Sequence, residues 1–292
     1  MIYIKYFSLI FILISFSSCL DNSDTNNNEI TNISKFNNNI FLNPQYNSKK
    51  LRNVIQGIAL FDENIFITQT YSKENLYISI LDNEGYPIFN KKFNSTSHGQ
   101  DLSIEKDKNN KLFLYTVGDD WKGIDKYKVE YNKDTMEYTD ISYLFNIKLN
   151  ISKNTSSISK DNKYFVSYFN GKIYIYENNQ KIDSLPLFTS FAISEKQTLK
   201  SEWIQGISMK DNLIYLLTSN NSINENKLLF IYDMHGNIIL EKKLYMGRKN
   251  ALTEGEKWEM EGLSFSNNSL YTTVMTGTDG NNTKRLFKID NF

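Results

Sequence analysis

The chain has 292 residues with 33 basic and 33 acidic side chains, and this balance argues against nucleic acid as a partner, because such binding needs concentrated positive charge. A single cysteine excludes an internal disulfide, so the fold depends on its core alone. Only two histidines occur, and there is no glycine-rich phosphate loop and no cysteine pair, so we expect neither a metal site nor a cofactor.

Residues 1–18 have the pattern of a secretory signal, with an early lysine, an apolar run and two serines directly before Cys19. The apolar run is shorter than the roughly 20 residues that a membrane-spanning helix needs. The end of this segment resembles a bacterial lipobox, with Phe16 where leucine is usual. We therefore predict a lipoprotein signal over residues 1–18 and an acylated Cys19 that anchors an exported protein in the bilayer of the cell membrane or outer membrane. The alternative is cleavage elsewhere beside an unmodified cysteine.

Residues 19–46 are rich in asparagine and serine and poor in apolar residues until Ile40. Such a composition buries too little apolar surface to fold. The sequence therefore predicts a disordered tether over residues 19–46 and a folded domain over residues 47–292.

From residue 51 onward, short alternating runs of β-branched and aromatic residues recur, separated by turns built from glycine, asparagine and aspartate. No long stretch has the period of an amphipathic helix. The sequence therefore predicts an all-β domain.

A short phrase, a polar residue followed by glycine and an apolar residue, opens several of these strands. Drifting copies begin near residues 57, 99, 157, 206 and 262, and each is followed by a tight turn and a second strand. Units of about 40–50 residues with four strands are typical of propeller blades, and glycine lets inner strands approach closely near an axis. We predict a five-bladed β-propeller; the alternative is a β-sandwich whose hairpins look alike.

These phrases also carry a resemblance to a known family. They are Gln56-Gly57-Ile58, His98-Gly99-Gln100-Asp101-Leu102, Gln205-Gly206-Ile207 and Glu261-Gly262-Leu263, with the late Gly277-Thr278-Asp279-Gly280. The chain resembles the five-bladed propeller shared by phage receptor-binding proteins and teichoic acid biosynthesis protein C, to which helveticin-type bacteriocins are similar. The resemblance implies contact with cell-envelope polymers and brings no catalytic residues with it.

If the strand starts share one rim, polar and aromatic side chains meet at a central mouth that suits a sugar-like polymer. The residues predicted to bind a ligand there are Gln56, His98, Gln100, Trp203, Gln205, Trp258 and Glu261. The alternative for the tryptophans is packing between blades.

The leading hypothesis is a non-catalytic, monomeric envelope lipoprotein whose propeller binds an envelope glycan or protein. One rival is a glycan hydrolase, since glycosidases use two acids about 5–10 Å apart. Its candidate acids are Asp101, Glu202 and Glu261, with Glu105 and Glu259 nearby in sequence. A second rival is a purely structural docking lipoprotein.

Overall fold

The computed structural model describes residues 39–44, 54–72, 75–119, 122–152, 155–158, 163–178, 184–193, 204–255, 257–278 and 281–289. All of them belong to one compact unit, Ile33–Phe292. The predicted signal, Cys19 and most of the predicted tether lie outside the described residues.

Most of the described residues belong to five four-stranded antiparallel sheets. Blade 1 contains β2 (Val54–Phe61), β3 (Asn64–Ser72), β4 (Asn75–Leu81) and β5 (Pro87–Asn94). Blade 2 contains β6 (Leu102–Lys106), β7 (Leu112–Val117), β8 (Lys122–Asn132) and β9 (Glu137–Ser152). Blade 3 contains β10 (Thr155–Ile158), β11 (Tyr164–Phe169), β12 (Lys172–Glu177) and β13 (Leu187–Ala192).

Blade 4 contains β14 (Ile204–Lys210), β15 (Leu213–Thr218), β16 (Lys227–Tyr232) and β17 (Ile238–Leu244). Blade 5 contains β18 (Lys257–Ser266), β19 (Ser269–Thr278), β20 (Asn281–Ile289) and β1 (Ile40–Phe41). A short helix, α2 (Arg248–Glu254), joins blade 4 to blade 5.

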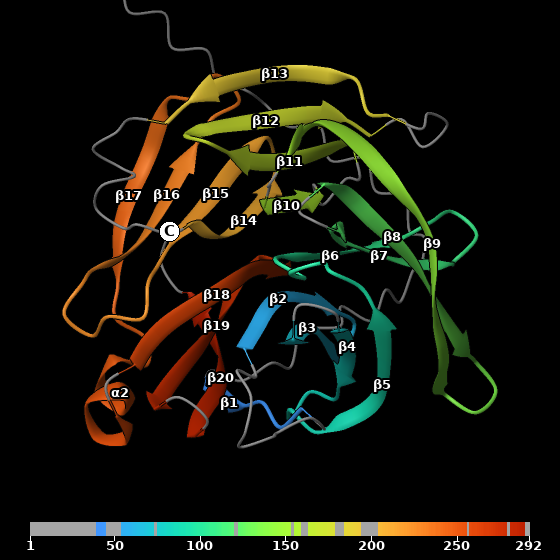
Figure 1. Ribbon diagram of the computed structural model, residues 1–292, viewed down its shortest axis with the longest axis horizontal. Helices are drawn as coiled ribbons and strands as arrows, with labels where there is room; N and C mark the ends of the chain where they lie inside the picture. Colours follow the sequence, from blue (N-terminus) through green and yellow to red (C-terminus); the bar gives the residue numbers. More distant parts are fainter. Residues whose placement is uncertain are drawn as a thin grey trace, which may run out of the picture. The chain divides into compact units, whose positions relative to one another are not determined.

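The five sheets surround a common centre, and the first strand of each blade from β2 to β18 lies nearest to it (Figure 1). The predicted all-β, five-bladed propeller is therefore confirmed, and the two-sheet sandwich is excluded. The recurring phrases lie on these innermost strands or directly before them.

Blade 5 is completed by the N-terminal strand. Ile40 of β1 pairs with Leu286, and Phe41 pairs with Arg285, so β1 forms the outer edge next to β20. Both residues fall in the segment predicted to be a tether over residues 19–46. The tether therefore does not reach residue 46, because Ile40 and Leu42 bury their side chains against blade 1.

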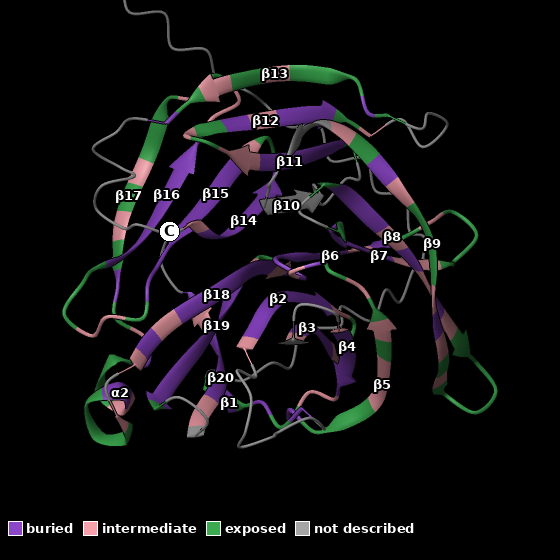
Figure 2. Cartoon of the chain, viewed as in Figure 1, coloured by how far each residue is buried: buried purple, intermediate pink, exposed green. Residues whose placement is uncertain are grey.

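The buried apolar residues of the described part of the chain form five clusters, each between two neighbouring blades. The inner strands β2, β6, β14 and β18 are mostly buried, whereas β5, β13 and β17 at the periphery are largely exposed (Figure 2). Packing between blades thus supplies the stability that the lone cysteine does not provide through a disulfide.

The glycines of the recurring phrase have the spatial role expected for them. A Cβ atom on Gly57 would lie 2.5 Å from the backbone carbon of Asp101, and one on Gly206 would lie 2.9 Å from that of Gly262. Gly262 in turn packs against Ile58 of blade 1. Inner strands of successive blades therefore touch backbone to backbone around the axis.

Blade 2 departs from the glycine pattern. Asp101, with a φ of 53°, takes the place that Gly57 and Gly262 hold in their blades. Thr116 Oγ1 donates to the Asp101 carbonyl as Thr272 Oγ1 donates to that of Gly262. Aspartate adopts this left-handed conformation more readily than most residues. In blade 2 the position that Gly57 and Gly262 hold in their blades is therefore occupied by Asp101 and not by Gly99.

Candidate functional site

The polar residues of the recurring phrases meet around the axis, as predicted, but their side chains are buried. Gln56, Gln100, Gln205 and Glu261 are each at most 9% exposed. Gln100 Nε2 donates to the Ile204 carbonyl at 2.9 Å and lies 3.4 Å from Gln205 Oε1. These contacts join blade 2 to blade 4 across the axis.

Asp101 contacts the inner strands of other blades. Its carboxylate accepts the backbone N–H of Ile207 in blade 4 at 2.8 Å, and its side chain is 1% exposed. Burial raises the pKa of Asp101 well above its usual value, although the backbone N–H groups of Ile207 and Leu263 oppose that rise. Asp101 therefore links three blades, from blade 2 to blades 4 and 5.

A second carboxyl group shares this centre. Burial raises the pKa of Glu261 well above its usual value, and the nearby charges of Glu259 and Asp101 raise it further. Gln205 Nε2 donates to Glu259 Oε1 at 3.1 Å. The predicted acids Asp101 and Glu261 are thus brought together. Burial favours the neutral, protonated form of both carboxyl groups.

The structure also describes the predicted residues His98 and Glu105. Burial lowers the pKa of His98 to about 4, so its ring is neutral at pH 7. Glu105 on β6 is buried and accepts a hydrogen bond from the Tyr115 hydroxyl of β7.

Trp258 is a core residue. Its ring is 1% exposed, its Nε1 donates to the Met246 carbonyl at 2.8 Å, and Lys227 Nζ lies 4.8 Å from the ring centroid. The arrangement matches the alternative of packing between blades and leaves no ring face for stacking on a sugar. Trp203 and Glu202 lie outside the described residues, as does Trp121, and the ligand-binding role of the seven predicted residues stays a prediction.

An open polar depression lies between blades 1 and 2. Its volume is about 570 Å³, within the usual range of ligand pockets, and its lining comes from Asn75, Lys92, Asn94, Ser95, Thr96 and Asp119. The lining comes from the first residue of β4, the end of β5 with the two residues after it, and the second residue after β7. The sequence gives no sign of this site because its lining comes from two blades.

Local hydrogen bonds fix the wall of this depression. Ser95 Oγ and the Ser97 backbone N–H both donate to Asp119 Oδ1, the latter at 3.1 Å. Ser97 Oγ donates to the Val117 carbonyl and accepts the Gly99 N–H. The run of small polar residues after β5 is thus held against the end of β7 before any ligand arrives.

In the described residues, no group of three or more histidine, cysteine, aspartate or glutamate side chains is arranged to hold a metal ion. No helix within the same residues has the length and apolar character to cross a membrane.

The comparisons with known proteins agree with this fold. A solved structure, the tail fiber of Staphylococcus aureus phage P68, is 16% identical with a TM-score of 0.62, and the match covers 88% of this chain and 53% of that chain. The chain thus spans about half the length of that tail fiber.

Two enzymes share the fold. An exo-β-1,3-galactanase from Phanerochaete chrysosporium is 9% identical with a TM-score of 0.53, over 87% of this chain and 64% of that one. A GH43_1 enzyme from Xanthomonas citri is 7% identical with a TM-score of 0.51, over 86% and 91% of the two chains. At such identities the likeness shows the fold alone.

No curated protein matches the sequence. A family model described as the phage 5-bladed beta propeller receptor binding platform domain matches residues 54–290, which include nearly the whole propeller. The likeness to teichoic acid biosynthesis protein C and to helveticin-type bacteriocins stays a prediction. The chain belongs to the family of phage five-bladed β-propeller receptor-binding platform domains.

Proposed function

We propose that this protein is an envelope lipoprotein, anchored through an acylated Cys19, whose propeller binds a cell-envelope glycan or protein without catalysing a reaction. The contact surface in this proposal is the polar depression between blades 1 and 2. The observation that carries the proposal is the coincidence of a receptor-binding platform family with an open, prearranged polar site.

The lining of the depression favours a hydroxyl-rich ligand. It offers two amides, two hydroxyls, one ammonium group and one carboxylate, with no aromatic ring. Amides and carboxylates exchange hydrogen bonds with sugar hydroxyls, whereas a protein anchor residue needs an apolar pocket. Among the two partners of the proposal, an envelope glycan is therefore the first choice.

A hydrolytic role is not proposed. Asp101 and Glu261 are buried, and Asp101 is bonded to the backbone of blade 4. A glycosidase acid and its partner must instead flank the scissile bond of a bound sugar. The two enzymes that share the fold add no argument, because their identity to this chain is too low.

The test is retention of purified bacterial surface polysaccharides and peptidoglycan by the immobilised protein. Lys92→Ala and Asn94→Ala alter exposed lining residues without touching the core. We expect each to weaken retention about tenfold, because a hydrogen bond to a charged or polar partner is lost. The matched control is Lys172→Ala, an exposed residue of blade 3. Equal retention by all three variants would exclude the depression as the binding surface.

A further inference from the structure

Helix α2 carries an exposed patch that the proposed function leaves without a role. Leu252 is 69% exposed and Tyr245 is 55% exposed. Arg248 and Lys249, both exposed, lie one turn before Leu252 on the helix, so cations flank the apolar side chain. These four residues are called the α2 patch.

The helix beneath this patch is firmly seated on blade 5. Ala251 is fully buried in the core between blades 4 and 5. A Cβ atom on Gly247 would lie 2.6 Å from Val274, so the start of the helix approaches β19 closely. The exposure of Leu252 is therefore a fixed feature of the surface.

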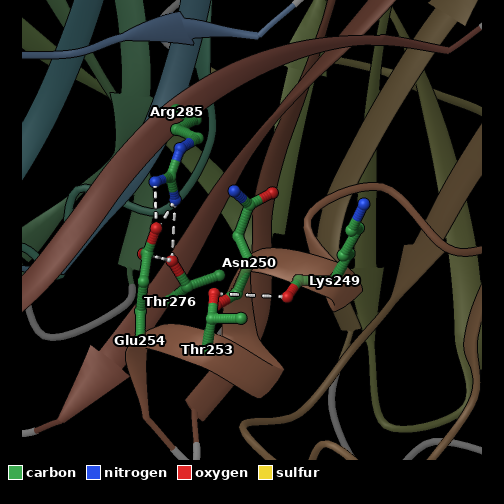
Figure 3. Close-up of polar contacts among 6 residues, drawn as sticks. All are labelled: Lys249, Asn250, Thr253, Glu254, Thr276 and Arg285. Atoms are coloured by element: carbon green, nitrogen blue, oxygen red, sulfur yellow. Dashed lines mark hydrogen bonds and ion pairs between the residues drawn. The ribbon is translucent and has the colours of Figure 1, made fainter.

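The other end of α2 is held by a buried charge. Arg285 on β20 donates to the Glu254 carboxylate and, at 2.8 Å, to Thr276 Oγ1, which itself donates to Glu254 at 2.6 Å. Figure 3 shows these three residues in contact, with Lys249 pointing away from them. The cationic side of the helix is thus separate from its anchoring side.

The same arginine joins α2 to the point where the chain enters the propeller. The guanidinium carbon of Arg285 lies 4.6 Å from the ring centroid of Phe41 in β1. Residues 20–39 separate β1 from Cys19. In the proposed function this segment is the predicted tether. A flexible tether of about 20 residues would have an end-to-end distance on the order of 25 Å, so an anchor at Cys19 would keep blade 5 close to the bilayer.

We infer that the α2 patch contacts the anionic headgroup surface of the membrane that holds Cys19. Leu252 and Tyr245 would enter the headgroup boundary while Arg248 and Lys249 meet lipid phosphates. This inference rests on the anchor in the proposed function. It adds a second, reversible contact that orients the propeller.

The chemistry of the patch selects a lipid over other occupants. Two apolar side chains bury far too little area for a stable protein interface. A cation close to an anionic membrane strengthens binding about fivefold, and the tether makes that weak contact intramolecular. A neutral glycan would gain no charge attraction from Arg248 and Lys249, and Leu252 offers it no hydrogen bond.

The experiment uses the full chain reconstituted in phosphatidylcholine vesicles with or without phosphatidylglycerol. A fluorescent amino acid at Leu252 reports contact through quenching by nitroxide-labelled lipids. The matched position is Phe188 on β13 of blade 3, which is similarly exposed. We expect quenching at Leu252 only with phosphatidylglycerol, and little at Phe188 in either vesicle.

Arg248→Gln and Lys249→Gln should each reduce the phosphatidylglycerol-dependent quenching about fivefold, whereas Lys172→Gln in blade 3 should not. Thermal unfolding checks that each variant folds.

Flotation in high salt separates the two hypotheses. If the chain floats but Leu252 is quenched no more than Phe188, the inference is wrong and the anchor stands. If the chain does not float, the anchor is wrong, and the free chain is then mixed with phosphatidylglycerol vesicles. Quenching at Leu252 in that mixture still supports contact between the α2 patch and the lipid, whereas no quenching overturns the inference.

Discussion

At the start of several inner strands, one residue lies directly against the backbone of a neighbouring blade. Gly57 and Gly206 have no side chain at this position, whereas Asp101 adopts a left-handed conformation and its carboxylate accepts the Ile207 N–H. Such a position limits both the size of the side chain and the charge that can be buried there.

Gly57→Ala should destabilise the propeller by about 3 kcal/mol, because the new methyl group meets the Asp101 backbone, which has no room to move. Gly171→Ala is the matched control. Gly171, unlike Gly57, has a positive φ, 75°, but a Cβ atom there has no neighbour within 4 Å, so only the conformational cost of about 1–2 kcal/mol applies. Urea unfolding measures both, and equal losses would contradict the close inter-blade contact.

Glu261→Gln should remove a pH dependence of stability. The pKa of Glu261 is raised in the folded protein, whereas an unfolded glutamate titrates near 4.3. As pH rises through that value the unfolded chain loses its proton first, so the stability of the wild type falls relative to the variant. Each unit of raised pKa is worth about 1.4 kcal/mol.

The measurement is urea unfolding of both proteins at pH 4 and pH 8. Relative to the wild type, the free energy of unfolding of Glu261→Gln should be higher at pH 8 and not at pH 4. Glu241→Gln at an exposed site should change stability by less than about 0.5 kcal/mol. A gap between wild type and Glu261→Gln that is the same at both pH values would refute the raised pKa.

At the scale of elements, the last blade differs from the others in how it is closed. β1 and α2 come from distant parts of the sequence and meet through Arg285 of β20. The arginine side chain is 3% exposed and that of Glu254 is 28% exposed. The two partners therefore differ in how well water can replace the lost contact.

Glu254→Gln should destabilise blade 5 by about 2–3 kcal/mol, because it leaves a buried guanidinium without its counter-charge. Arg285→Met should cost less, since Glu254 is partly hydrated and the methionine fills the buried site. Hydrogen exchange of the α2 amides, combined with urea unfolding, measures both effects. A larger loss in Arg285→Met than in Glu254→Gln would show that this pair does not hold the helix.

At the scale of the whole molecule, the sequence predicts the ring and misses the parts assembled from distant segments. Alternating apolar runs and the repeated phrase indicate the five blades because both patterns are local. β1 escapes detection because only two paired residues lie in an asparagine-rich segment, and α2 because its seven residues are too few to show a helical period.

The candidate site is predicted only in part, for the same reason. The polar residues of the phrases do gather at the axis, but burial and cross-axis hydrogen bonds depend on blade spacing, which the sequence does not reveal. The depression between blades 1 and 2 combines Asn75 with Asp119. A pair so far apart along the chain leaves no local pattern.

The central claim is that the ligand binds at this depression and does not reach the buried residues around the axis, Gln100, Asp101, Gln205 and Glu261. Hydrogen-exchange footprinting of the full chain with the surface polymer that it retains tests the claim most directly. We predict protection of the backbone at residues 92–97 and 118–119, with no change at Gln205 or Glu261. Protection at the axis strands, with residues 92–97 unchanged, would contradict it.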